Sequence, residues 1–404
     1  MTWRIWFALL CLWSFELAAV PAESTVGELL AERLALMRDV AAYKWHHDLP
    51  IEDLEREQRV LDNAVLSGLQ YRLHADTTRQ FFSLQITAAK AIQQHWHTRW
   101  QRGENAPDSP DLNHAVRPQL LLLGEYIVEQ WAKDNGGDPE ALAQRLGQVE
   151  GMPVALALAI AQAAASPRSY PDVARQVLDS GILRVGTTGD YAPFSLSADG
   201  DYRGSDIELA RWLADQLRVS VVFVQTSWPT LMADHQRNRF DIALSGITET
   251  ADRAQLARFS VPYYQDGKMA LGRCEHSAQF NSLADIDQPE IRVIVNPGGT
   301  NQRFVNQHIK QATVRVFPDN RTIFDELVAA RADIMITDHI EAQLQAARHP
   351  TLCVLNTGYL STHRKAILMQ ADASLEALIN KPLAIALREG LVRHWIDAAL
   401  GVAY

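Results

Sequence analysis

The sequence predicts a multidomain chain in which an all-α domain precedes an α/β region built from two lobes. Residues 24–165 are rich in Ala, Leu, Gln, Glu and Arg, contain few glycines and space their apolar residues at helical intervals. The pattern of apolar and polar residues changes near "ASPRSYPD" (165–172). After it, short apolar strands alternate with amphipathic helices, which is typical of a mainly parallel sheet. The length of 404 residues also suggests two or three domains.

The composition narrows the class of protein. Apolar residues make up 47% of the chain, which is enough for globular cores and argues against disorder. The formal net charge of -10 argues against nucleic acid as a partner. A small anionic ligand is still compatible with this charge, because a local cluster of Arg and Lys can override the global sign.

The first residues read "MTWRIWFALLCLWSFELAAVPAES". Arg4 is a short positive region, an apolar run follows it, and small residues precede a cleavage position after Ala22. We therefore predict a signal peptide over residues 1–22 and a periplasmic mature protein without a membrane partner. The alternative is an N-terminal membrane anchor, but Glu16 interrupts the run, which is short for a span.

The helical domain is expected over residues 23–167. Its long helices are "LLAERLALMRDVAAYKW" and "TTRQFFSLQITAAKAIQQHWHTRW", with further helices in "HAVRPQLLLLGEYIVEQWA" and "GDPEALAQRL". The Pro, Asp, Asn and Gly content of "RGENAPDSPDLN" (102–113) predicts a loop between them.

The α/β region is expected over residues 168–404. One series of strands and helices begins at "ILRVGTT" and a second near "IRVIVNPGGTNQRFVNQHI". We assign lobe 1 to about 180–272 and 362–404, and lobe 2 to about 273–361. Two α/β lobes of similar length indicate a ligand cleft between them.

Two cysteines remain after removal of the predicted signal peptide, which contains Cys11. An even pair in an oxidising compartment favours a disulfide between Cys274 and Cys353. The alternative is two separate buried thiols.

Charged and amide side chains of the helical domain share helix faces. Arg33 and Lys44 are eleven residues apart, close to three helical turns. Further members of this set are Asp53, Arg56 and Glu57, then Gln85, Ala89 and Gln93, and finally Arg117. Buried cations need compensation, and a dianionic ligand would supply it. Any one of these residues alone is more often a solvated surface residue.

The order "ERLALMRDVAAYKW…LPIEDLERE…QITAAKAIQ…RP" resembles the secreted, all-helical subclass of chorismate mutases over about 25–135. The pericyclic rearrangement of chorismate to prephenate requires a clamped diaxial conformer and stabilisation of the ether oxygen, without nucleophile or metal. The resemblance implies that the carboxylates are bound by Arg33, Arg56 and Arg117, the ether oxygen by Lys44 and Gln93, and the ring hydroxyl by Glu57, with Asp53 in support.

Two positions depart from the mutase pattern. Ala89 stands where several members carry a small hydroxyl residue, so a hydrogen bond is lost there. Gln93 stands where some members use Glu, and an amide donates without needing a proton. We therefore expect the mutase activity to survive at neutral and mildly basic pH.

The α/β region resembles periplasmic amino-acid-binding proteins through "ILRVGTTGDYAPFSL", "YRGSDIELARWLADQL", "SGITETADRA" and "FSVPYYQDGK". The resemblance implies that Arg253 holds a ligand carboxylate with help from Thr248. Aromatic residues expected to line the cleft are Tyr191, Phe194 and Trp228. The turn "NPGGTN" places backbone N–H groups of Gly298, Gly299, Thr300 and Asn301 at a helix start, which suits a second carboxylate.

More particular motifs, "VNPGGTNQRF", "DN.TIF", "TDHIEAQLQ" and "HP.LC", resemble cyclohexadienyl dehydratase over roughly 172–400. That enzyme aromatises prephenate to phenylpyruvate, or arogenate to phenylalanine, with loss of water and carbon dioxide. Hydroxide leaves poorly, so an acid must protonate it. The resemblance implies that Glu341 is this acid with Lys268 beside it, and that the substrate is held by Asn296, Thr300, Asn301 and Arg253, near Trp228 and Thr248.

Together the two resemblances predict a bifunctional exported enzyme of phenylalanine biosynthesis, with chorismate and prephenate as substrates and without metal or cofactor. The alternatives are an amino-acid receptor with a helical dimerisation module, and a mutase without dehydratase activity. Glu341 is then only a carboxylate favoured by the helix dipole. Asp338 is predicted as a helix cap. The role of Lys268, the use of arogenate and a homodimer stay open.

Overall fold

The computed structural model describes residues 24–134 and 137–401, and the predicted signal peptide lies outside these ranges. The chain divides into two compact units, residues 1–169 and 170–404, which are described separately. Within the described residues, no helix is both long enough and apolar enough to cross a membrane.

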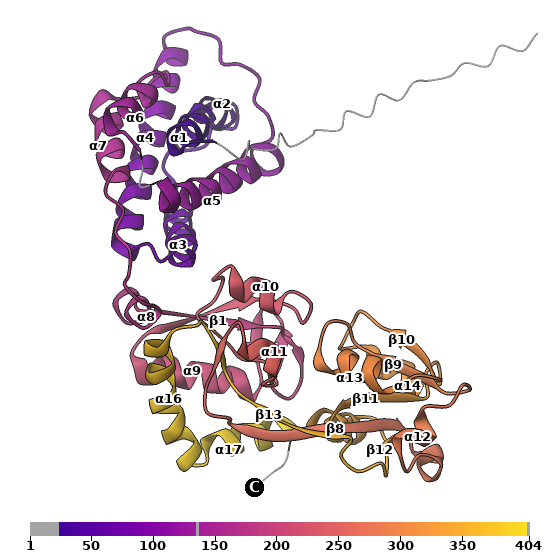
Figure 1. The fold of residues 1–404 in the computed structure, drawn as a ribbon. Helices are drawn as coiled ribbons and strands as arrows, with labels where there is room; N and C mark the ends of the chain where they lie inside the picture. The colour runs from indigo at the N-terminus through magenta and orange to yellow at the C-terminus, as the bar shows by residue number, and fades with distance from the viewer. Residues whose placement is uncertain (1–23, 135–136, 402–404) are drawn as a thin grey trace, which may run out of the picture. The chain divides into compact units, whose positions relative to one another are not determined.

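The first unit is wholly helical (Figure 1). Its helices are α1 (Val26–Ala35), α2 (Met37–His46), α3 (Leu54–Gln70), α4 (Ala75–Gln101), α5 (Arg117–Asp134), α6 (Pro139–Leu146) and α7 (Val154–Ala164), with one π-helical turn at Leu112–Val116. The helix predicted as continuous from "LLAERLALMRDVAAYKW" is interrupted at Leu36, which separates α1 from α2.

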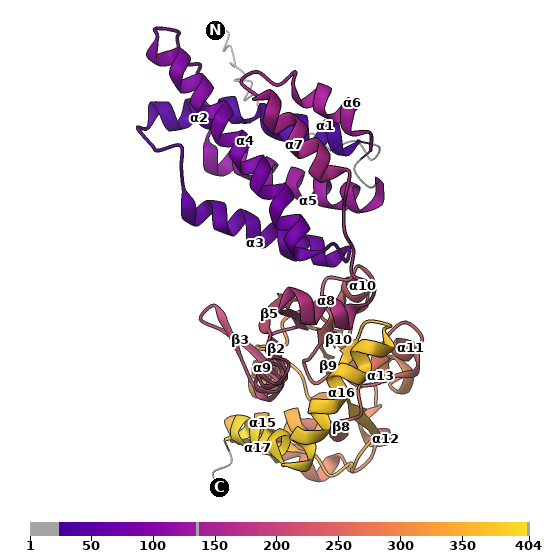
Figure 2. The same ribbon diagram turned by 90° about the vertical axis from the view of Figure 1, so that its left-hand side faces the viewer.

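Helix α4 organises this unit. Figure 2 shows it running through the bundle, and it packs against α2, α3 and α7. Apolar residues on its buried faces, such as Phe81 and Trp96, join a core that includes Trp131 of α5. The polar side chains Gln85 and Gln93 are buried on the same helix. Burying two amide side chains in an apolar bundle costs free energy unless they form hydrogen bonds. This face of α4 is therefore a candidate for binding a polar ligand.

The second unit contains two large sheets and one small sheet (Figure 1). The first has the strand order β5 (Ser220–Gln225), β1 (Ile182–Thr187), β6 (Ile242–Ala243), β14 (Leu368–Met369) and β7 (Arg258–Phe259). Beside it lies a small sheet of β2 (Asp190–Tyr191), β3 (Ser195–Ala198) and β4 (Asp201–Arg203). The helices of this lobe are α8 (Val173–Ser180), α9 (Ser205–Leu217), α10 (Leu231–Gln236), α11 (Ala251–Ala254), α16 (Ala373–Arg388) and α17 (Leu391–Leu400).

The second lobe is built on the order β10 (Thr313–Val316), β9 (Arg292–Val295), β11 (Ile334–Asp338), β8 (Tyr264–Arg273) and β12 (Leu352–Val354), with β13 (Ser361–Lys365) also paired to β8. Its helices are α12 (Leu283–Ile286), α13 (Thr300–His308), α14 (Ile323–Val328) and α15 (His339–Arg348), with a 3-10 turn at Cys274–Gln279. The structure contains the predicted disulfide between Cys274 and Cys353, which joins this turn to β12.

The lobe boundary differs from the predicted one at residue 273. All of β8 pairs with strands of the second sheet, so the second lobe begins at Tyr264. The chain returns to the first lobe after Lys365. The register pairs Lys268, in the middle of β8, with Asp338 at the end of β11 and with Ser361 at the start of β13. This arrangement gathers charged residues from distant parts of the sequence at one place.

Candidate active sites

In the helical unit, Arg33 lies inside the protein with 8% of its surface exposed. Its guanidinium donates to Oε1 of the fully buried Gln85 at 3.1 Å. Burial lowers the pKa of Arg33 to about 10, which still leaves the side chain charged at neutral pH. A buried cation held by a neutral amide keeps its charge available for an anionic ligand.

A second group of charges surrounds Lys44 in α2. Its ammonium donates to the backbone carbonyl of Ile51 at 2.6 Å. Burial lowers the pKa of Lys44, while Asp53 and Glu57 oppose this shift and Arg117 and Arg56 add to it. The structure thus brings Lys44 within electrostatic reach of all four predicted residues, although three of them lie at the start of α3 and Arg117 lies at the start of α5.

Several buried polar atoms on these residues have no hydrogen-bond partner among the described residues. They are Nε of Arg33, Nε2 of Gln85, Oε1 of Gln93 and Nε of Arg117. Buried polar groups are nearly always paired, so a polar ligand at this face would compensate them. Gln93 donates to the carbonyl of Ala89 at 3.1 Å, and Glu57 accepts from Lys90 at 3.0 Å.

In the α/β unit, a narrow cavity lies between the two lobes. The six predicted substrate-binding residues all line it: Trp228, Thr248, Arg253, Asn296, Thr300 and Asn301. The other lining residues are Tyr191, Gly246, Gly299, Asn320, Asp338 and Lys365. Phe194, which the sequence predicted to line the cleft, is fully buried behind Tyr191 in the core of the first lobe.

The base of the cavity holds a network of two lysines around Asp338. Lys268 and Lys365 each donate to this carboxylate at 2.5 Å, and the hydroxyl of Tyr191 donates to it as well. Burial alone would raise the pKa of Asp338, but the two ammonium groups hold it well below its usual value. Asp338 occupies the predicted N-cap position of α15, but its side chain makes no capping hydrogen bond and binds the two lysines instead.

Glu341 lies in the first turn of α15 with 1% of its surface exposed. The hydroxyl of Thr337 donates a hydrogen bond to its Oε2. Burial raises the pKa of Glu341 to about 8; the Thr337 hydrogen bond and Lys268 oppose the shift, and Asp338 and Asp190 add to it. Burial therefore outweighs the nearby ammonium, and the carboxyl group is protonated at neutral pH.

Amide side chains connect the cavity wall to this acid. Nδ2 of Asn301 donates to Asn296 and to the hydroxyl of Thr337, both at 3.1 Å. Thr337 in turn donates to Glu341. Lys268 donates to the hydroxyl of Thr300 at 2.9 Å and also to Asn301. The predicted residues of the second lobe thus form one continuous hydrogen-bonded network.

The sequence motifs did not single out three residues of this site. Lys365, which also donates to Thr248 at 3.0 Å, comes from β13. Asp190 accepts from the Trp228 indole at 3.1 Å, and Asn320 donates to the backbone carbonyl of Asp190 at 2.9 Å. The "DN" of "DN.TIF" contains Asn320, so that motif carried a signal for one of them.

The two-lobed architecture and the polar cavity between the lobes define the class of protein. Residues 183–397 match the model of the bacterial extracellular solute-binding proteins, family 3, and residues 24–94 match that of chorismate mutase type II. The chain therefore belongs to family 3 of the bacterial extracellular solute-binding proteins, and a chorismate mutase type II domain precedes this part.

Comparison with individual relatives shows which proteins each of the two parts of the chain resembles. The chain is 43% identical to a cyclohexadienyl dehydratase from Pseudomonas aeruginosa over 249 residues, which are 60% of this chain and 93% of the relative. It is 34% identical to a secreted chorismate mutase from Yersinia pestis over 106 residues, which are 26% of this chain and 57% of that protein. The chain thus combines a mutase domain with a solute-binding domain of the cyclohexadienyl dehydratase kind, and these relatives indicate an exported protein.

Solved structures support the same assignment of the fold. An ancestral amino acid-binding protein, described as a precursor of cyclohexadienyl dehydratase, superposes with a TM-score of 0.53 and 30% identity. The superposition covers 56% of this chain and 99% of that chain.

Proposed function

We propose that the chain is a periplasmic bifunctional enzyme that converts chorismate to prephenate and then prephenate to phenylpyruvate. The first step belongs to the helical unit and the second to the cleft of the α/β unit. Arogenate, which carries an amino group in place of the side-chain keto group, is proposed as a second substrate of the cleft.

In the mutase step, the cations of the helical unit bind the two carboxylates of chorismate. Arg33, Arg56 and Arg117 supply the positive charge. The electrostatic effect of Arg56 and Arg117 on Lys44 supports this assignment, and so does the burial of Arg33 next to Gln85. Lys44 and the amide of Gln93 stabilise the negative charge that develops on the ether oxygen. The protein has only to hold the reactive conformer and offer these donors, because the rearrangement is unimolecular.

In the dehydratase step, Arg253 and the ammonium groups of Lys268 and Lys365 bind the dianion. The ring carboxylate leaves as carbon dioxide, its bonding electrons enter the ring, and the C4–O bond breaks. Glu341 transfers its proton to the departing oxygen, so that water leaves instead of hydroxide. The ring becomes aromatic, and Glu341 is left as a carboxylate.

The observation that carries this proposal is the burial of Glu341, which Thr337 joins by hydrogen bonds to Asn301 in the cavity wall. A pKa raised to about 8 keeps this acid protonated at neutral pH, next to a cavity whose lining includes Arg253 and Lys365. A solute receptor gains nothing from an uncharged, buried carboxyl group beside its ligand, whereas a lyase that expels hydroxide requires one.

The test is to supply the purified protein with chorismate and to follow phenylpyruvate by its absorbance, with prephenate measured separately. We expect prephenate to appear first and phenylpyruvate to follow. Accumulation of prephenate alone would leave only the mutase, and tight binding of an amino acid without turnover of either substrate would support a receptor.

A further inference from the structure

The charged groups that line the cavity between the lobes carry more positive than negative charge. They are Arg253, Lys365 and Asp338, so Asp338 is the only carboxylate in the described lining of this cavity. Both of its oxygens already accept from cations: Oδ1 from Lys268 and Oδ2 from Lys365, each at 2.5 Å. The hydroxyl of Tyr191 also donates to Oδ2. A positively charged group of a ligand would therefore meet a carboxylate that is already paired.

The two lysines differ in the number of acceptors that they bind. Lys268 donates to Asp338 and to two further side chains of the second lobe. Within residues 24–134 and 137–401, Lys365 donates only to Asp338 and to the hydroxyl of Thr248. Its Nζ also lies 5.4 Å from the ring centre of Tyr191, which lines the cavity too. Because a lysine ammonium carries three N–H groups, one donor of Lys365 is left for a ligand.

Thr248 holds Lys365 next to Arg253. Nη1 of Arg253 donates to the backbone carbonyl of Thr248 at 2.8 Å, and Lys365 donates to the hydroxyl of the same residue at 3.0 Å. Both cations line the cavity. A carboxylate bound by Arg253 would thus have the substituent of its α-carbon near Lys365. This pair of donors suits an α-keto acid, in which adjacent carbons both carry oxygen acceptors.

Other acceptors near the cavity do not supply a free negative charge. Oδ1 of Asn320, a lining residue, is buried and has no hydrogen-bond partner among the described residues, but an amide oxygen is neutral. Asp190 is not part of the described lining. The indole of Trp228 donates to its Oδ1 at 3.1 Å, and burial raises the pKa of Asp190. These acceptors suit a ligand hydroxyl better than an ammonium.

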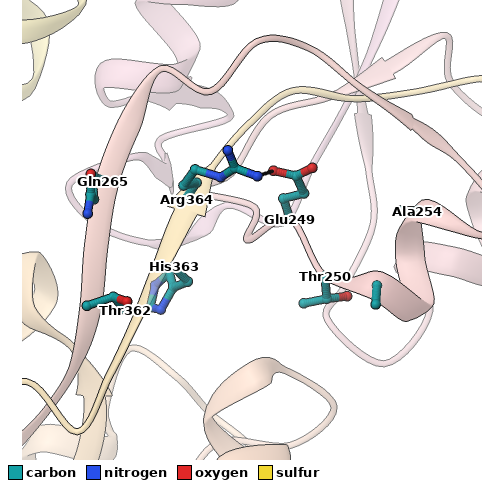
Figure 3. Close-up of a pocket in the computed structure, with 8 residues that line it drawn as sticks. Glu249, Thr250, Ala254, Gln265, Thr362, His363 and Arg364 are labelled. Atoms are coloured by element: carbon teal, nitrogen blue, oxygen red, sulfur yellow. Dashed lines mark ion pairs between the residues drawn. The ribbon is translucent and has the colours of Figure 1, made fainter.

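A second pocket of this unit does not supply the missing carboxylate either. Residues that line it include Glu249, His363 and Arg364 (Figure 3). Glu249 is the one acid in its described lining, and it pairs with Arg364 at 2.9 Å. Neither Arg253 nor Lys365 lines this pocket. An ammonium bound at Glu249 would therefore lie in a different pocket from a carboxylate bound at Arg253.

We propose that Lys365 is a specificity-determining residue, which makes the cleft select the keto acid prephenate over the amino acid arogenate. This inference rests on the proposed dehydratase function and ranks its two substrates. They differ in the group next to the side-chain carboxylate, which is a keto oxygen in prephenate and an ammonium in arogenate. The remaining N–H of Lys365 donates to the keto oxygen. The ammonium of arogenate instead meets the like charge of Lys365, while Asp338 is already occupied.

The test measures kcat/KM for prephenate and for arogenate in the wild type and in Lys365→Met. Methionine has a similar length but neither charge nor donor, so Oδ2 of Asp338 becomes available to an ammonium. We expect the wild type to favour prephenate about 100-fold or more. In Lys365→Met this ratio should shrink about tenfold or more, because prephenate loses more than arogenate. The control is Lys381→Met, at an exposed position of α16 in the first lobe, which should keep the wild-type ratio.

A binding measurement on the wild type needs no variant. Phenylpyruvate and phenylalanine carry the same difference between a keto group and an ammonium, and calorimetric titration should show phenylpyruvate binding about tenfold or more tightly. Equal kcat/KM for the two substrates, tighter binding of phenylalanine, or an equal loss for both substrates in Lys365→Met would overturn the proposal. Failure of the wild type to make phenylpyruvate from prephenate would instead refute the dehydratase function itself.

Discussion

Thr337 and Glu341 are joined by a hydrogen bond from the threonine hydroxyl to the glutamate carboxyl group, across the junction of β11 and α15. The bond fixes the acid at the end of a network that begins at Asn296 and passes through Asn301. The position of Glu341 in the first turn of a helix would also suit a simple dipole-stabilised carboxylate. Its burial and raised pKa instead favour a neutral acid.

The pH dependence of the two activities should differ. The pKa of Glu341 is raised to about 8, so the acid is protonated below this pH and ionised above it. The kcat/KM for prephenate should be constant on the acidic side and fall about tenfold per pH unit above about 8. Mutase turnover, which uses the amide of Gln93, should stay nearly constant between about pH 5 and 8. A steep fall of the mutase rate in that range would contradict this assignment.

The raised pKa also predicts a stability effect of Glu341→Gln. Between the ordinary value of 4.5 and about 8, the folded carboxyl group binds more protons than the unfolded one. The stability that Glu341 contributes is therefore complete below 4.5 and is lost as the pH rises through about 8. The free energy of unfolding of the glutamine variant, measured with denaturant, should rise relative to that of the wild type by on the order of 2–4 kcal/mol between about pH 5 and 8. A pH-independent difference would argue against a buried neutral acid.

Lys44→Ala should disable the mutase without affecting the dehydratase. Lys44 lies within electrostatic reach of Asp53, Arg56, Glu57 and Arg117. Its loss removes the proposed donor to the developing ether anion. We expect the kcat/KM for chorismate to fall about 100-fold or more, while turnover of added prephenate is unchanged. The control is Lys133→Ala, an exposed lysine on α5 that pairs with Glu129. Retained mutase activity in Lys44→Ala would refute the site in this domain.

Reduction of the disulfide should weaken the second lobe. Cys274 and Cys353 close a loop with a sequence separation of 79 residues. In the chain-entropy model, opening such a loop lowers the free energy of unfolding by about 4 kcal/mol. Thermal unfolding with and without reductant measures the effect, and the double variant Cys274→Ser, Cys353→Ser should not respond to reductant. Equal stability of the oxidised and reduced wild type would contradict the expectation.

The sequence was informative where a motif is local. "NPGGTN" and "TDHIEAQLQ" each place their functional residues within a few positions of one another, so the family resemblance could be carried over to Thr300, Asn301 and Glu341. All three belong to the network around the cavity in the structure. The alternation of strands and helices predicted both lobes for a similar reason, because it is a local pattern.

The sequence was uninformative where the fold joins distant segments. Lys365 reaches Asp338 only because β13 returns to pair with β8, which also moved the lobe boundary from 273 to Tyr264. Asp338 has the position of a helix cap, and no local pattern reveals that two lysines occupy its oxygens.

The central claim, that a buried acid makes this solute-binding fold an enzyme, is tested most directly by supplying chorismate to Glu341→Gln. The variant keeps the hydrogen bond from Thr337 but has no proton to give. We expect prephenate to accumulate at the wild-type rate and phenylpyruvate formation to fall about 100-fold or more. The control is Glu389→Gln, at an exposed position, which should behave as the wild type. Phenylpyruvate formation at the wild-type rate in Glu341→Gln would contradict the account.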